Sequence, residues 1–173
     1  MAKYLELRRH ADNEDDVLST AGVRQALEIG AGLDGDYDLL VSSGAQRATQ
    51  TLACFLASIG RKVPGGVVVV EGLRSQSEDR WRAAYAEAGK SDLEALRLVD
   101  PGLVEQDSAK LGSALLSVFD RVSDGARVLV VGHSPTNEAA VLGLTGQVVA
   151  PIAKGGGVLI EEENGRFRVE RLR

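Results

Sequence analysis

The sequence predicts an α/β fold with three layers: a mainly parallel sheet, helices on both of its faces, and an antiparallel hairpin at the C-terminal edge. Two observations support this prediction. Short apolar runs alternate with longer amphipathic segments along most of the chain, as they do in strand–helix–strand units. The last two apolar segments instead flank an Asn-Gly pair, which suits a tight hairpin turn. The length of 173 residues fits one domain, residues 1–173.

The predicted strands are short and rich in Val and Leu. The first alternates apolar and polar side chains, and the others are continuous apolar runs of the kind buried in parallel sheets. They cover residues 3–9 (KYLELRR), 37–43 (YDLLVSS), 67–70 (VVVV) and 127–133 (RVLVVGH). The closing hairpin covers residues 157–172, with Asn164–Gly165 at its turn.

Helical segments lie between these strands. Ser19 or Thr20 can cap the first helix, and Ser134 can cap the last one, which carries Pro135 in its first turn. The middle helices are expected over residues 46–59, 75–99 with a break at Gly89, and 109–122, after a punctuation at Pro101–Gly102. Residues 75–102 are longer than a bare connection requires, so we expect them to cap a crevice and select the substrate. Trp81 and Tyr85 either pack this cap or line its pocket, and packing is the preferred interpretation.

Composition excludes several classes of protein. The net charge of −5 argues against broad nucleic-acid binding, which needs a basic face. No apolar run reaches membrane-spanning length and no signal peptide is apparent, so we expect a cytoplasmic protein without membrane contact. Cys54 is the single cysteine; it cannot form an internal disulfide and is interpreted as a small buried hydrophobe. Oligomeric state is not readable from the sequence.

Polar residues gather where predicted strands end. Arg9 and His10 end the first strand, Ser43 ends the second, and His133 ends the fourth. These two histidines are the only ones in the chain. Ligands of open parallel sheets bind at the carboxyl ends of the strands. We therefore expect both histidines to face one crevice.

The chemistry of this residue set points to phosphate. Two histidines without further ligands at metal-binding spacing do not make a zinc site, so no metal or cofactor is expected. Arginine pairs its N–H groups with phosphate oxygens, and a helix start after His133 would add donors. A neutral histidine can act as a nucleophile. An acidic chain must capture such an anion with a local cationic pocket.

Four segments resemble one known family. LRRHADN is similar to the Arg-His-Gly signature of the histidine phosphatase superfamily, also called phosphoglycerate mutase-like, and VVGHSP is similar to its second-histidine motif. SSGAQRATQT and LSTAGVRQA resemble two further motifs of the family. The segments occur in family order from Lys3 to about Gly146. The resemblance is closest to the small phosphohistidine-phosphatase branch and implies the phosphoglycerate mutase-like fold.

The resemblance implies roles for individual residues. His10 is the nucleophile that becomes phosphohistidine, and Arg9, Arg47 and His133 surround the phosphoryl group without a metal. His133 acts best when protonated. Candidate substrate-binding residues are Asn13 and Ser134. Two neighbours are assigned otherwise: Arg8 is placed on the opposite strand face in a surface role, and Ser43 either orients Arg47 or caps its helix.

Departures from the family pattern concern the general acid. Ala11 replaces a Gly and Gly44 a frequent Pro, while Ser75 stands where larger members carry a glutamate. Glu71, Glu78 or Asp79 could supply the proton, and Glu78 is preferred. Phosphohistidine leaves more easily than an alkoxide, so the gap favours a phosphatase over a mutase.

Three functions therefore compete. The first is a metal-independent phosphatase acting on a phosphorylated small molecule or a phosphoprotein, at a phosphomonoester or phosphohistidine. The second is a non-catalytic module that binds phosphate or phospholigands. The third, a nucleotide-binding α/β domain of another class, is weak because no Gly-x-Gly-x-x-Gly follows the first strand.

Overall fold

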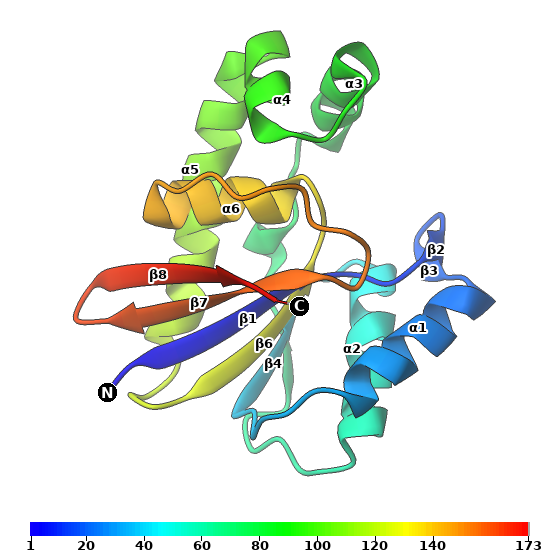
Figure 1. Ribbon diagram of the computed structural model, residues 1–173, viewed down its shortest axis with the longest axis vertical. Coiled ribbons are helices and arrows are strands. Elements are labelled where there is room, and N and C mark those ends of the chain that lie inside the picture. Colours follow the sequence, from blue (N-terminus) through cyan, green and yellow to red (C-terminus); the bar gives the residue numbers. More distant parts are fainter. Residues whose placement is uncertain (173) are drawn as a thin grey trace.

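The computed structural model describes residues 1–172 and contains a six-stranded sheet with helices on both faces (Figure 1). The strand order is β5-β4-β6-β1-β7-β8. Neighbours from β5 to β1 are parallel, whereas β7 and β8 are antiparallel. The strands are β1 (Lys3–Arg9), β4 (Leu39–Ser42), β5 (Val67–Val69), β6 (Arg127–Gly132), β7 (Gly157–Glu163) and β8 (Arg166–Arg171). This arrangement confirms the predicted fold class.

Two groups of helices cover the sheet. On one face α1 and α2 bury Leu52 and Phe55 against the sheet, and on the other α5 and α6 bury Leu111 and Leu115. Alternation along β1 divides its side chains between these faces. The helices are α1 (Thr20–Ala31), α2 (Gln46–Ile59), α3 (Glu78–Ala88), α4 (Leu93–Val99), α5 (Pro101–Asp120) and α6 (Thr136–Thr145), with a 3-10 turn at Glu71–Leu73.

Helix α5 starts earlier than the expected residue 109. It begins at Pro101, and the Asp100 side chain caps it by accepting a hydrogen bond from the Leu103 N–H at 3.1 Å. Proline suits the first helical position because the N–H that it lacks would have no partner there. Pro101 therefore begins this helix, whereas the sequence predicts a break between two helices at Pro101–Gly102.

Two further expectations about helix starts and loops are resolved. Ser19 is the N-cap of α1 and accepts from the Gly22 N–H, as predicted. Ser134 is not the cap of α6, because this helix begins at Thr136 with Pro135 as its N-cap residue. The acidic loop after His10 contains a small hairpin, β2 (Asn13–Glu14) and β3 (Val17–Leu18).

Residues 75–102 contain α3, α4 and the first two residues of α5, and α3 and α4 stand away from the sheet (Figure 1). Trp81 is buried there, and its Nε1–H donates to Asp107 of α5 at 2.7 Å. We call residues 75–102 the cap. None of the helices within residues 1–172 is long and apolar enough to cross a bilayer. Cys54 of α2 is partly buried against the core, and burial raises the pKa of its thiol.

Candidate active site

Two neighbouring parallel strands, β1 and β6, bring the two histidines together. Arg9 of β1 lies opposite Gly132 of β6 in the parallel register, so His10 and His133 leave the sheet side by side. The His10 N–H donates to the Gly132 carbonyl at 3.0 Å. The ring centroids are 5.4 Å apart, and both histidines are buried. The two histidines therefore lie side by side, as the strand ends led us to expect; His133 lines the adjoining pocket, and His10 is not among its lining residues.

The His10 ring is oriented by its own backbone neighbour. Nδ1 lies 2.7 Å from the Ala11 carbonyl oxygen. A carbonyl only accepts hydrogen bonds, so Nδ1 carries the proton and Nε2 keeps its lone pair when the ring is neutral. Burial lowers the pKa of His10 to about 4, and Arg47 and Arg9 act in the same direction. His10 is thus a neutral imidazole at pH 7, as a nucleophile must be.

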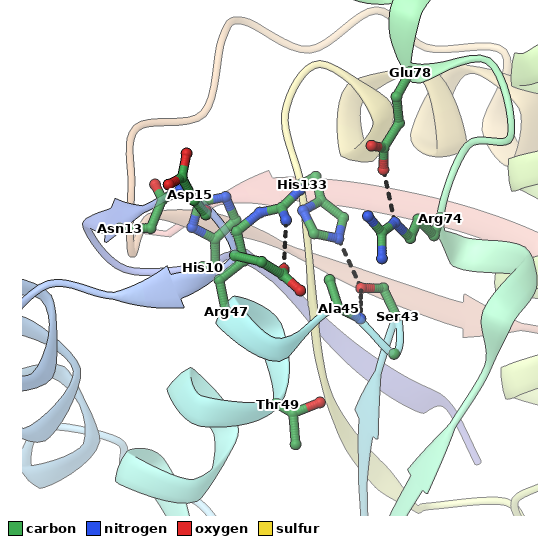
Figure 2. Close-up of polar contacts among 12 residues, drawn as sticks. His10, Asn13, Asp15, Ser43, Ala45, Arg47, Thr49, Arg74, Glu78 and His133 are labelled. Carbon is green, nitrogen blue, oxygen red and sulfur yellow. Dashed lines mark hydrogen bonds and ion pairs between the residues drawn. The ribbon is translucent and has the colours of Figure 1, made fainter.

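The His133 ring makes a different hydrogen bond. Its Nε2 lies 2.7 Å from Ser43 Oγ, and its buried Nδ1 has no partner within residues 1–172. Figure 2 shows this second nitrogen on the side of the ring toward Arg47 and His10. The pKa of His133 is lowered to about 3, mainly by burial and next by the positive charge of Arg47. The free protein therefore holds His133 neutral, and only a bound anion would favour the expected protonated form.

The two arginines reach the site from different elements. Arg47 lies in the first turn of α2 and forms an ion pair with Asp16 of the β2–β3 hairpin, Nη1 to Oδ1 at 2.7 Å. Arg9 donates from Nη1 to the Ile152 carbonyl at 3.0 Å. Burial lowers the pKa of Arg9, and Glu138 counteracts this effect. Both arginines line one pocket together with His133.

A pocket of about 420 Å³ opens between this cluster and the cap. Trp81 and the half-exposed Tyr85 form part of its wall from α3. Its lining residues are Arg9, Arg47, Ser75, Glu78, Trp81, Arg82, Tyr85, Ser91, His133, Ser134, Pro135 and Thr136. Residues of the cap therefore form one wall of the pocket, and Trp81 both packs the cap and lines the pocket.

Of the three carboxylates considered as general acid, Glu78 alone lines this pocket among residues 1–172. Its Oε1 accepts from Arg74 Nε at 2.7 Å (Figure 2). Asp79 is almost fully exposed and pairs with Arg82 on the surface, and Glu71 is exposed. Ser75 is buried and donates to Asp107, so it supports the cap.

The two candidate substrate-binding residues have different surroundings. Ser134 lines the pocket, and its Oγ donates to Glu138 Oε1 at 2.8 Å. Asn13 lies outside the pocket lining and donates from Nδ2 to the Asp15 carbonyl at 2.7 Å. Figure 2 shows Asn13 on the hairpin side of the cluster, near Asp15.

Two assignments from the sequence are wrong. Arg8 does lie on the opposite face from Arg9, but it has no surface role. Its side chain is 11% exposed, pairs with Glu6 at 2.8 Å and donates to the Gly155 carbonyl. Ser43 forms its short hydrogen bond with His133 and also accepts from the Ala45 N–H at 3.5 Å; Ala45 is the N-cap residue of the helix of Arg47, which has no side-chain cap.

Sequence reasoning missed three residues of the site. They are Asp16, Arg74 and Glu138, which contact Arg47, Glu78 and Ser134 respectively. Glu138 lies in the first turn of α6, close to the serine that precedes this helix, and that serine donates to it. Within residues 1–172, no three His, Cys, Asp or Glu side chains are grouped as metal ligands.

Solved structures share this fold over nearly the whole chain. Phosphoglycerate mutase from Bacillus anthracis str. Sterne has a TM-score of 0.76 at 19% identity, covering 99% of this chain and 92% of that one. A mutant of phosphoserine phosphatase from Entamoeba histolytica, in complex with phosphoserine, has a TM-score of 0.70 at 16% identity, covering 96% and 94%. A protein assigned as the phosphohistidine phosphatase SixA from Agrobacterium tumefaciens has a TM-score of 0.59 at 21% identity, covering 98% and 97%. At these identities the similarity establishes the fold.

No sequence among curated proteins matches the chain. The model of the histidine phosphatase superfamily (branch 1) matches residues 4–154. That range includes both histidines and both arginines of the cluster, and the fold agrees with that of the solved structures. The chain belongs to branch 1 of the histidine phosphatase superfamily.

Proposed function

We propose that the protein is a metal-independent phosphatase that hydrolyses a small phosphomonoester through a phosphohistidine on His10. One observation carries the proposal. His10 presents an unprotonated Nε2 because Nδ1 is bonded to the Ala11 carbonyl, and its ring lies beside that of His133, which lines one pocket together with Arg9 and Arg47. This set supplies a nucleophile together with fixed donors for three phosphoryl oxygens.

In the first step His10 Nε2 attacks phosphorus. The N–P bond forms as the bond between phosphorus and the leaving oxygen breaks. Charge spreads over the three equatorial oxygens, which Arg9, Arg47 and His133 stabilise by hydrogen bonding. Ser43 holds the His133 ring so that its other nitrogen faces this charge.

In the second step water attacks the phosphohistidine, the N–P bond breaks, and orthophosphate leaves. Glu78 is the residue we assign to proton transfer, giving a proton to the leaving oxygen and taking one from the water. Its hydrogen bond with Arg74 holds the carboxylate at the pocket wall. Neither step calls on a metal ion, because the arginines and His133 supply the positive charge.

The pocket supports a small organic leaving group. A volume of about 420 Å³ lies within the range of small-molecule sites. Trp81, Tyr85 and Arg82 offer aromatic and cationic contacts beyond the phosphoryl group. A phosphohistidine on a folded protein would have to enter beneath the cap, so the small ester is the preferred substrate class.

The test is hydrolysis of an aryl phosphate and a panel of small phosphoesters, including a phosphohistidine peptide. We expect turnover that a chelator leaves unchanged, and an acid-labile phosphoryl group on His10 after rapid quenching. His10→Ala should lower activity at least about a thousandfold, as loss of a nucleophile does. Arg61→Ala, which removes an exposed arginine on the surface, is the control. Full activity in pure His10→Ala would refute the mechanism.

The second candidate is a phosphate-binding module without turnover. Ser75 in place of a glutamate and the pairing of Glu78 with Arg74 favour it. It predicts orthophosphate binding that requires Arg9 and Arg47, with no hydrolysis of any panel member. Turnover by the wild type that disappears in His10→Ala excludes it.

A further inference from the structure

A buried carboxylate lies directly behind the proposed phosphate site. Glu138 of α6 is 1% exposed, yet it belongs to no ion pair within residues 1–172. Its Oε1 accepts two hydrogen bonds, from the Ile152 N–H at 2.7 Å and from Ser134 Oγ at 2.8 Å. A carboxylate is rarely buried this completely unless it is paired with another polar group, because burial removes its hydration.

The same residue whose N–H binds Glu138 also holds Arg9. The Ile152 carbonyl accepts from Arg9 Nη1 at 3.0 Å. Ile152 lies in the segment between α6 and β7, outside any helix or strand. Ile152 therefore connects Glu138 to the Arg9 guanidinium: its N–H donates to the carboxylate, and its carbonyl accepts from the arginine.

Charge links the two side chains as well. Glu138 Oε2 and Arg9 Nε are both buried without a partner within residues 1–172. Burial raises the pKa of Glu138 and lowers that of Arg9, and each group opposes the shift of the other. The carboxylate thus serves as counter-charge to an arginine that makes no ion pair in that part of the chain.

We propose that Glu138 is a positioning residue for Arg9: it fixes the Ile152 backbone, whose carbonyl aims the guanidinium at the phosphoryl group. The inference rests on the proposed function of Arg9 as a phosphate ligand. Glu138 itself does not touch the substrate. Glu138 influences the reaction only by placing the N–H donors of Arg9 against the phosphoryl group.

The test compares two substitutions of similar size. Glu138→Met removes both acceptor contacts, whereas Glu138→Gln keeps an amide oxygen that can accept from Ile152 and Ser134. We expect Glu138→Met to weaken orthophosphate binding and lower kcat/KM by about 10- to 100-fold, the effect of losing a hydrogen bond to a charged group. Glu138→Gln should stay within about threefold of the wild type. Equal losses in both variants, or no loss in Glu138→Met, would overturn the proposal.

A double-mutant cycle separates positioning from general loosening. In an Arg9→Lys background, which keeps a cation without the paired donors, Glu138→Met should change the orthophosphate Kd by less than about twofold. Additive losses would mean that Glu138 acts independently of Arg9. Leu142→Ala, on the same helix and outside the active-site pocket, controls for destabilised α6 and should keep the wild-type Kd.

The proposed function fails in a different way. If Arg9→Lys leaves both Kd and kcat/KM unchanged, Arg9 is not a phosphate ligand. If Arg9→Lys is impaired while Glu138→Met is normal, the function stands and the positioning role is wrong.

Discussion

At the scale of single residues, the two histidines share burial but differ in their hydrogen bonds. His10 donates a hydrogen bond from Nδ1–H to a carbonyl and keeps the lone pair of Nε2 free, whereas Nε2 of His133 is hydrogen-bonded to a serine hydroxyl. A hydroxyl can donate or accept, so Ser43 stays bonded when His133 gains a proton. This difference supports a nucleophile role for His10 and a variable charge on His133.

Asp16 provides a test at this scale. Its carboxylate occupies Arg47 in the free protein, where it competes with an incoming phosphate. Asp16→Asn should lower the inhibition constant for orthophosphate about two- to five-fold, the effect expected for a half-exposed ion pair. The measurement is competitive inhibition of aryl phosphate hydrolysis at two salt concentrations, since screening should reduce the difference.

Asp36→Asn is the control, because that carboxylate pairs with Arg61 on the surface. An inhibition constant that rises in Asp16→Asn would mean that Asp16 holds Arg47 ready for phosphate.

The sequence predicts the members of this site better than their partners. Arg9, His10, Arg47 and His133 follow motifs and strand ends, and the structure brings them together. The contacts of Asp16 with Arg47 and of Ser43 with His133 join residues far apart in the chain. Such pairings leave no periodic pattern, so sequence reasoning could not find them.

At the scale of elements, one carboxylate attaches the cap to the body. Asp107 of α5 is buried and accepts from Trp81 Nε1 and Ser75 Oγ. Trp81 and Ser75 belong to the cap and line the pocket. The shape of the leaving-group side of the pocket therefore depends on a residue outside it.

Asp107→Ala tests this attachment. The variant leaves a buried indole N–H and a hydroxyl without a partner, which should cost about 1–3 kcal/mol of unfolding free energy. We expect the KM of a small phosphoester to rise while the inhibition constant of orthophosphate stays unchanged, because orthophosphate has no leaving group. Steady-state kinetics and denaturant unfolding measure both effects. An orthophosphate constant that weakens as much as KM would contradict this division of the pocket.

Element boundaries show where local sequence signals suffice. Ser19 caps α1 as predicted, and Gly60 ends α2 in the left-handed conformation that glycine adopts easily, because capping depends on neighbouring backbone groups. The prediction for Pro101 was wrong, since a proline can end one helix or begin the next, and the Asp100 side chain decides in favour of a start. The β2–β3 hairpin has only two residues in each strand, too few for an alternation to be recognised.

At the scale of the whole molecule, the buried histidines make stability depend on pH. Their pKa values in the folded protein, about 4 and about 3, lie below the value of 6.5 in an unfolded chain. Between these values the unfolded state binds more protons, so stability is full above pH 6.5 and falls as the pH is lowered.

Denaturant unfolding at pH 7 and pH 5 measures this dependence. We expect a loss of about 2 kcal/mol for each histidine between these pH values, and a smaller loss in a His10→Asn/His133→Asn variant. A variant with the same loss as the wild type would assign the acid sensitivity to carboxylates. Bound orthophosphate should reduce the loss in the wild type by binding the folded state.

The fold class follows from the alternation of strands and helices, but the order of the strands does not. Apolar runs identify β1, β4 and β6, and nothing local indicates that β6 lies between the other two. That order depends on how helices fill the two faces. The position of the hairpin beside β1 likewise depends on contacts between the two ends of the chain.

The strand order has a consequence for the time course of biosynthesis. Leu5 of β1 pairs with Val128 on one side and with Ile160 on the other, so β1 leaves the ribosome long before either neighbour exists. In the nascent chain the apolar side chains of β1 therefore stay unpaired and exposed, where chaperones can bind them and wrong contacts can form. His10 directly follows β1, so its surroundings are complete only when the final third of the polypeptide, which contains β6 and β7, has emerged.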